Sequence, residues 1–138
     1  MRIRARTRER ARALQLLYAR ELLGPGPVAA AATGLIRLTG HPTREIENAE
    51  RLAGNVLAEA PELDREVAGA IEHWRLDRLG VVERNILRLA IHELRSEAVP
   101  PKVAINEAIQ LARWFGGPKS AAFVNGVLDR VAHTMGRL

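Results

Sequence analysis

The sequence contains no cysteine, few aromatic residues and no long hydrophobic run. The absence of cysteine excludes disulfides, thiolate zinc sites and cysteine nucleophiles, and it is compatible with a reducing compartment. No apolar stretch approaches the roughly 20 residues of a membrane span, and the basic N-terminus is not followed by the apolar segment of a signal peptide. We therefore expect a cytoplasmic protein.

Aromatic residues make up only 4% of the 138 residues, whereas hydrophobic residues make up 47%. The core must therefore consist of Leu, Ile, Val and Ala, and these residues favour helices when they are combined with abundant Arg and Glu. The length allows one continuous core but leaves no room for a second full domain. We predict an all-α fold, with residues 1–138 forming a single compact bundle.

Helical spacing of apolar residues and the positions of Gly and Pro predict about seven helices. The first spans residues 6–23, with Leu14, Leu17, Tyr18 and Leu22 as its buried stripe, and a short second helix spans 28–38. The third starts after a Thr43 cap, and the fourth starts beside Pro61. Apolar residues cover more than half the circumference of the fifth, residues 81–95, which predicts a central helix. The sixth ends at Gly116-Gly117-Pro118, and the seventh carries Phe123 to Val131.

The net charge of +5 comes entirely from the first dozen residues. Six arginines at alternate positions are opposed there by Glu9 alone, whereas the other 126 residues carry equal numbers of acidic and basic side chains. Alternate residues cannot share one face of a helix, so we interpret residues 1–12 as a basic arm that enters the first helix. Such an arm favours an acidic partner, and composition leaves RNA, a membrane surface, an acidic protein or simple solubility open.

Known catalytic and metal-binding patterns do not occur in the sequence. The four histidines are scattered singly, and His92 lacks a second histidine at the spacing that a zinc protease requires. Gly116 and Gly117 continue into Pro118 without the spacing of a phosphate-binding loop, so they indicate the end of a helix. We expect neither enzymatic activity nor a cofactor or metal.

Several segments resemble the NusB family of transcription antitermination factors. The C-terminal third carries Val99-Pro100-Pro101-Lys102-Val103-Ala104-Ile105-Asn106-Glu107-Ala108-Ile109, then Ala112-Arg113-Trp114-Phe115-Gly116 and Phe123-Val124-Asn125-Gly126-Val127-Leu128-Asp129. These segments have the order and spacing seen in the family. The Arg-rich start and the helix from Val82 to Leu94 are also similar, so the resemblance spans nearly the whole chain. It implies a non-enzymatic, seven-helix protein that binds boxA RNA of ribosomal RNA leader transcripts together with ribosomal protein NusE, in an RNA polymerase antitermination complex.

The resemblance also implies two sets of site residues. The RNA-binding set combines the basic start with the last helices: Arg4, Arg6, Arg8, Arg10, Lys102, Phe115, Lys119 and Phe123. The set that contacts NusE lies on the first and fifth helices: Tyr18, Leu22, Glu83 and Arg84. Periodicity alone is equally compatible with core positions for Tyr18 and Leu22, and aromatic residues in a helical stripe are more often core than stacking platforms. We interpret Asn106 and Asn125 as structural residues that bond the backbone or each other.

Two alternatives stay open. The chain also resembles the NusB-like N-terminal domain of a ribosomal RNA cytosine methyltransferase, whose catalytic domain would follow as a separate fold. It is also compatible with a structural homodimer that buries the stripe of the first helix and would thereby compete with NusE.

Overall fold

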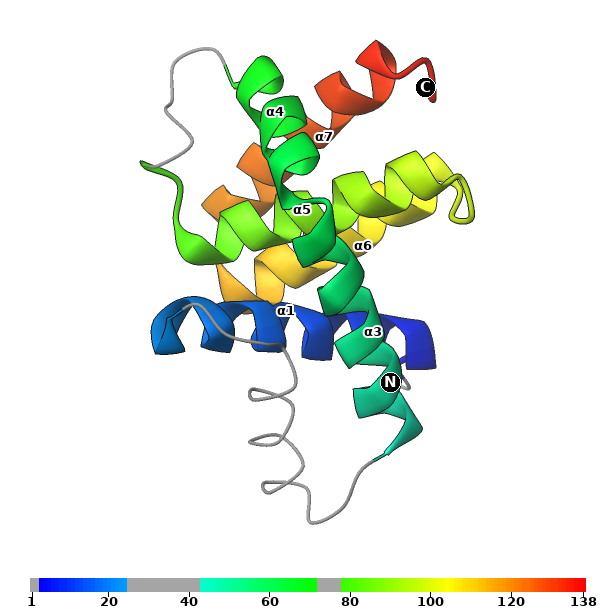
Figure 1. The fold of residues 1–138 in the computed structure, drawn as a ribbon. Coiled ribbons are helices and arrows are strands. Elements are labelled where there is room, and N and C mark those ends of the chain that lie inside the picture. The colour runs from blue at the N-terminus through cyan, green and yellow to red at the C-terminus, as the bar shows by residue number, and fades with distance from the viewer. Residues whose placement is uncertain (1–2, 25–42, 72–77) are drawn as a thin grey trace. The chain divides into compact units, whose positions relative to one another are not determined.

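The computed structural model describes residues 3–24, 43–71 and 78–138, and these residues form six helices and no strand (Figure 1). The all-α prediction is therefore confirmed. Contacts between residues divide the chain into two compact units, residues 1–58 and 59–138. The single domain expected over residues 1–138 stays a prediction.

The first unit consists of helix α1 (Ala5–Leu23) packed against helix α3 (Arg44–Ala58). Leu14, Leu16 and Leu17 are the large buried residues of α1, whereas α3 buries Ile46 and Val56 together with small alanines. The hydroxyl of Thr43 accepts the backbone N–H of Ile46 at 3.2 Å, which confirms the predicted cap of α3. Helix α1 ends before Gly24, whose φ of 91° favours glycine.

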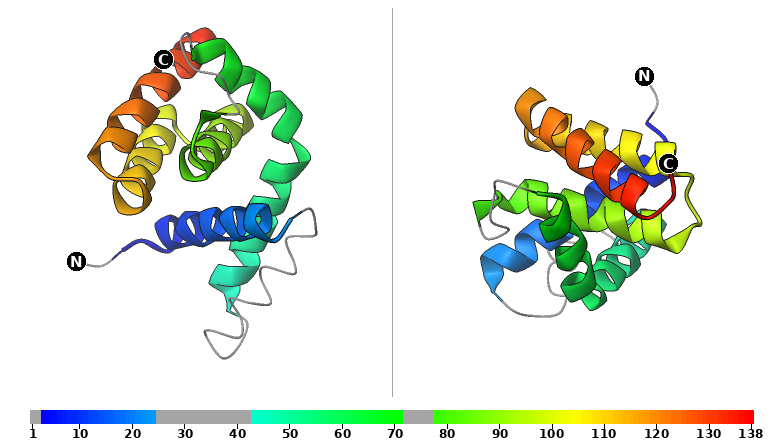
Figure 2. Two further views of the ribbon diagram at one scale, coloured as in Figure 1. Left: turned by 90° about the vertical axis from the view of Figure 1, so that its left-hand side faces the viewer. Right: turned by 90° about the horizontal axis from the view of Figure 1, so that it is seen from above.

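The second unit contains α4 (Ala60–Ala70), α5 (Val81–Ser96), α6 (Pro101–Phe115) and α7 (Pro118–Thr134). Helix α5 contacts all three of the others, and α6 and α7 lie side by side along their length (Figure 2). Ile86, Leu87, Ile91 and Leu94 of α5 are completely buried. The prediction of a central fifth helix is therefore confirmed.

Polar contacts connect α4 and the residue before it to the middle and second half of α5. The guanidinium of Arg88 donates two hydrogen bonds to the carboxylate of Asp64, at 2.7 and 2.8 Å. One turn further along α5, Nδ1 of His92 lies 2.7 Å from the carboxylate of Glu59, which precedes α4. The half-buried His92 thus has a carboxylate partner within the second unit.

Helix boundaries agree with the predictions to within a few residues. Helix α1 begins at Ala5, one residue before its predicted start, so the basic arm predicted over residues 1–12 overlaps the helix from Ala5 onward. Helix α5 ends at Ser96 because Glu97 adopts a left-handed conformation with φ of 60°. The predicted second helix, residues 28–38, lies outside the described residues.

Candidate nucleic-acid interface

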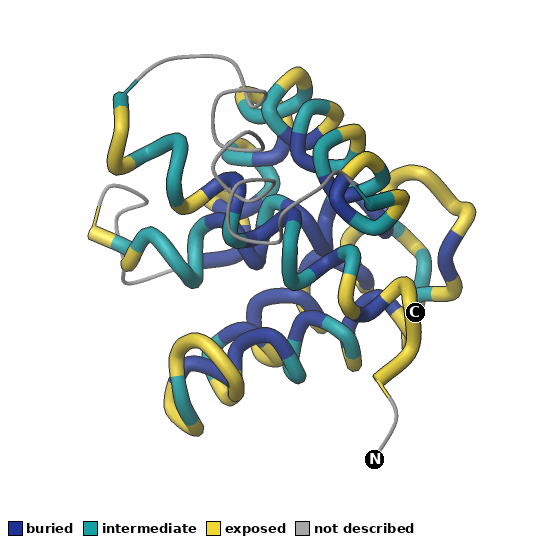
Figure 3. The backbone as a smooth tube through the Cα atoms, turned by 90° about the horizontal axis from the view of Figure 1, so that it is seen from below, coloured by how far each residue is buried: buried dark blue, intermediate teal, exposed yellow. Residues whose placement is uncertain are grey.

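Arg4 and Arg6 are the accessible cations at the start of α1. Both side chains are exposed, as are all residues from Ile3 to Arg6 (Figure 3). Neither guanidinium forms a hydrogen bond or ion pair with the rest of the described chain. The first turn of α1 also lacks an acidic residue, so its cations add to the positive end of the helix dipole. This end of α1 therefore attracts anions.

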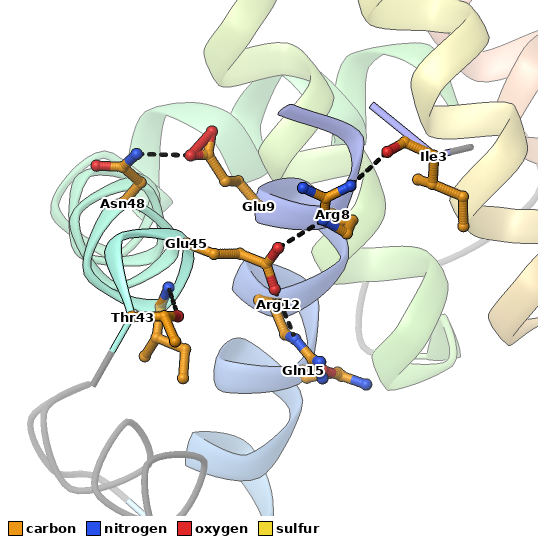
Figure 4. A network of polar contacts seen from close by, with 9 residues as sticks. Ile3, Arg8, Glu9, Arg12, Gln15, Thr43, Glu45 and Asn48 are labelled. Atoms are coloured by element: carbon orange, nitrogen blue, oxygen red, sulfur yellow. Dashed lines mark hydrogen bonds and ion pairs between the residues drawn. The ribbon is translucent and has the colours of Figure 1, made fainter. Parts of the chain in front are cut away.

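Two further arginines of α1 share one carboxylate from α3. Nε of Arg8 lies 2.7 Å from Oε1 of Glu45, and Nε of Arg12 lies 3.3 Å from Oε2 of the same residue (Figure 4). Arg8 also donates to the backbone oxygen of Ile3, and Arg12 donates to the amide oxygen of Gln15 at 3.1 Å. These two guanidinium groups are therefore partly occupied within the first unit.

The pair of arginines changes the acidity of Glu45. Burial alone would raise the pKa of this carboxyl, but hydrogen bonds from Arg8 and Arg12 and the positive charges of both residues outweigh that effect. The pKa of Glu45 is consequently lowered below its ordinary value. Glu45 therefore stays ionised and keeps both arginines bound at neutral pH.

Arg10 differs from the other arginines because its side chain is buried, with 5% exposure. The neighbouring Glu9 of α1 faces α3, and its carboxylate accepts a hydrogen bond from the side-chain amide of Asn48 at 2.6 Å. The helical conformation turns Arg10 inward, so it cannot meet RNA without rearrangement.

The remaining predicted RNA contacts lie on α6 and α7 in the second unit. Phe115 ends α6 and is 39% exposed, Lys119 is exposed in the first turn of α7, and Phe123 is half-buried one turn later. Lys102 is also exposed but belongs to the first turn of α6, about 20 Å from Phe115 along the helix axis. The structure thus brings Phe115, Lys119 and Phe123 to one end of the helix pair and places Lys102 at the other.

Sequence reasoning missed Trp114 and a groove between α6 and α7. Trp114, beside Phe115, is 46% exposed, which is unusual for so large an apolar side chain. The groove has a volume of about 450 Å³ and is lined by side chains of both helices: Ile109, Arg113, Pro118, Ala121, Ala122 and Asn125. The two small alanines are the sequence feature that leaves this space open.

The structural interpretation of Asn106 and Asn125 is wrong. Both side chains are exposed, and neither forms a hydrogen bond within the part of the chain that the structure describes. They face outward because each occupies the solvent side of its helix, opposite the buried alanine and valine positions. Their amide groups are therefore available to a ligand.

Glu83 connects the start of α5 with the start of α7. Its carboxylate accepts a hydrogen bond from the hydroxyl of the buried Ser120. Arg84, the other predicted contact on α5, donates to the backbone oxygen of Leu79 at 3.2 Å. Both residues are half-buried, so the predicted partner surface on α5 is built from side chains already held in place.

Tyr18 and Leu22 do not belong to the core as the predicted stripe of the first helix implied. Tyr18 is 40% exposed and Leu22 is 66% exposed, whereas Leu14 and Leu17 are buried. Leu23 continues this exposed apolar surface at the end of α1. An apolar cluster exposed at a helix end is typical of a protein contact.

Comparison with known proteins identifies the family. The sequence model of the NusB family matches residues 7–133, across both units. The chain belongs to the NusB family. It is 45% identical to the transcription antitermination protein NusB of Anaeromyxobacter sp. (strain Fw109-5), over 92% of this chain and 89% of that protein.

Solved NusB structures have the same fold. NusB of T. maritima aligns with a TM-score of 0.79 and 32% identity, over 96% of this chain and 93% of that one. NusB in a crystal structure of the antitermination factors NusB and NusE with double-stranded RNA aligns with a TM-score of 0.83 and 26% identity, over 96% and 99% of the two chains. The chain is thus an antitermination factor of the NusB family and not an enzyme.

No helix among the described residues is long and apolar enough to cross a membrane. The same residues contain no group of three or more His, Asp or Glu side chains that could hold a metal ion.

Proposed function

We propose that this NusB-family protein binds single-stranded boxA RNA of ribosomal RNA leader transcripts together with ribosomal protein NusE, and that it does so in the cytoplasm as part of an RNA polymerase antitermination complex. The concentration of the whole net charge in the first dozen residues carries this proposal, because localised cations neutralise phosphates and release counterions. The solved structure of NusB and NusE in complex with double-stranded RNA supports the part of the proposal that concerns NusE and RNA in general, since this chain shares that NusB fold.

The described geometry divides the RNA contacts into two kinds. Arg4 and Arg6 supply free guanidinium groups for phosphates, and Lys119 supplies an exposed ammonium at the start of α7. Phe115 and Trp114 supply exposed rings on which unpaired bases can stack. Cations and exposed rings together favour a flexible single strand, whose bases are accessible, over a duplex.

NusE contacts the exposed apolar side chains Tyr18 and Leu22 on α1. It also contacts Glu83 and Arg84 on α5, whose charged groups are held in place by hydrogen bonds. Exposed large apolar residues and polar groups held in a fixed orientation are both common in protein interfaces. The named relatives are antitermination proteins, which favours this function over the N-terminal domain of a methyltransferase.

Binding of labelled boxA RNA, a scrambled RNA of the same length and a boxA duplex, each with and without NusE, tests the proposal. We expect the single-stranded boxA RNA to bind most tightly and NusE to increase its affinity further. Equal binding of boxA and scrambled RNA in the presence of NusE would contradict sequence recognition, and tighter binding of the duplex would contradict the single-strand assignment.

A further inference from the structure

The groove between α6 and α7 presents two facing rows of side chains. On α6, Asn106, Ile109 and Arg113 recur at helical spacing and share one face. On α7, the facing row begins at the first turn of the helix and contains three residues at the same spacing: Pro118, Ala122 and Asn125. A two-residue link joins the helices, which lie side by side (Figure 2). Ile109 and Arg113 of α6 and Pro118, Ala122 and Asn125 of α7 line the groove between them, whereas Asn106 lies one turn beyond Ile109 on α6.

The chemistry of the groove combines an apolar floor with unoccupied polar groups. Ile109 and Ala122 contribute apolar surface, whereas Arg113 and Asn125 contribute a planar cation and an amide. Neither of these polar side chains has a hydrogen-bond partner among the described residues, and none of the described lining residues is acidic. The volume of about 450 Å³ lies within the range of small-ligand sites.

The charges around the groove are unequal along its length. Lys119 is exposed beside Pro118, so the end of the groove near Arg113 carries two cations. One turn beyond Asn125, the carboxylate of Asp129 lies 3.7 Å from Nδ1 of His133 and adds negative charge at the other end. The exposed Lys102 also lies at that end, in the first turn of α6, so the charge there is mixed and a polyanion is attracted most strongly at the Arg113 end.

We infer that this groove holds one nucleotide of the bound single-stranded RNA. The base lies on Ile109 and Ala122, the amide of Asn125 hydrogen-bonds its edge, and the guanidinium of Arg113 contacts the adjoining phosphate. An acidic peptide would meet the same cation, but apolar side chains beside an amide with both a donor and an acceptor favour a base. The inference rests on the proposed RNA-binding function and adds a pocket to the exposed rings at the end of α6.

Filling the groove tests the inference directly. Ala122→Leu occupies the floor without changing charge, and Asn125→Ala removes the amide. We expect each variant to weaken binding of a labelled single-stranded boxA RNA on the order of tenfold, as expected when one bound base is lost. Arg113→Ala should weaken binding and also reduce the steepness of its salt dependence by the amount of about one phosphate contact.

Two exposed positions on other helices of the same unit provide matched controls. Ala68→Leu adds the same bulk on α4, and Arg95→Ala removes the same charge at the end of α5; both should leave RNA affinity unchanged. Thermal unfolding of each variant checks that the fold is retained. RNA affinity of Ala122→Leu and Asn125→Ala equal to that of the controls would overturn the groove assignment, and so would a selective loss of NusE binding. Loss of RNA binding in Arg4→Ala/Arg6→Ala with no effect of the groove variants would overturn the groove alone and leave the proposed function intact.

Discussion

Glu45 holds two guanidinium groups of α1 on one carboxylate, and this arrangement affects both folding and RNA binding. Its lowered pKa means that the folded protein favours the ionised form. The stability gained in this way is present above the pKa of the unfolded chain, about 4.3, and is lost as the pH falls through the lower pKa of the folded state. The same contacts withdraw Arg8 and Arg12 from an incoming phosphate.

Glu45→Gln should therefore have opposite effects on stability and on RNA affinity. At neutral pH the unfolding free energy should fall by about 0.5–1 kcal/mol, because the ion pairs are partly solvent-exposed. RNA affinity should rise, because Arg8 and Arg12 become available to phosphates. Thermal unfolding between pH 7 and pH 3 and RNA titration at neutral pH measure the two effects, and the stability difference should vanish at the acidic end.

Glu47→Gln is the control for this prediction, because Glu47 lies in the same first turn of α3 but is exposed and forms no ion pair among the described residues. Glu47→Gln should change the unfolding free energy and the RNA affinity less than Glu45→Gln does. RNA affinity that stays constant or falls in Glu45→Gln would show that Arg8 and Arg12 take no part in RNA binding.

At the residue scale, the sequence predicted the location of the charge but not which charges are free. Counting identified the arginines of the first dozen residues, yet Glu45 lies 37 positions after Arg8 and meets it only because α3 packs on α1. The burial of Arg10 likewise depends on the phase of the helix within the folded unit. Long-range pairing of this kind is not encoded in local spacing.

At the element scale, Gly116 marks the turn from α6 to α7 and also allows a close approach. A Cβ at this position would lie 2.7 Å from Cβ of Ser120 and would overlap its hydroxyl, which is bonded to Glu83. The φ of Gly116 is −124°, so space and not backbone conformation requires the glycine. The turn between the two helices is thus held together by contacts of Gly116, Ser120 and Glu83.

Gly116→Ala should lower the unfolding free energy by about 1–3 kcal/mol, because the added methyl group must displace Ser120 from a packed site. Gly126→Ala, within α7, is the matched control, since its Cβ would meet nothing within 4 Å. That substitution should raise stability by about 0.5–1 kcal/mol through helix propensity. Urea unfolding of both variants measures the difference, and equal stabilities would contradict the packing role of Gly116.

The helices themselves were predictable because their signals are local. The Thr43 cap, the Pro61 start and the Gly116-Gly117-Pro118 stop each lie within a few residues of the boundary that they determine. The groove between α6 and α7 was not predictable, because it depends on which faces of two helices meet. Periodicity identified apolar residues but placed Tyr18 and Leu22 in the core, since it cannot tell whether a neighbouring element covers the end of a helix.

At the scale of the whole molecule, residues 13–138 carry no net charge, and the entire excess of positive charge lies in the first twelve residues. In the structure, Arg4 and Arg6 at the start of α1 are exposed, whereas Arg10 is buried and Arg8 and Arg12 bind Glu45. Because single-stranded RNA releases counterions when its phosphates are neutralised, the salt dependence of binding counts the contacts that form. The family assignment predicts that RNA is bound, and the charge distribution predicts where.

The salt dependence of boxA binding by Arg4→Ala/Arg6→Ala tests the central claim most directly. Each lost phosphate contact should reduce the slope of log affinity against log salt by about 0.7, so the double variant should be flatter by about 1.4. Arg65→Ala/Arg95→Ala removes the same charge from exposed positions of the second unit and should leave the slope unchanged. A slope in Arg4→Ala/Arg6→Ala equal to that of the unaltered protein would contradict the assignment of the N-terminal arginines as the phosphate site.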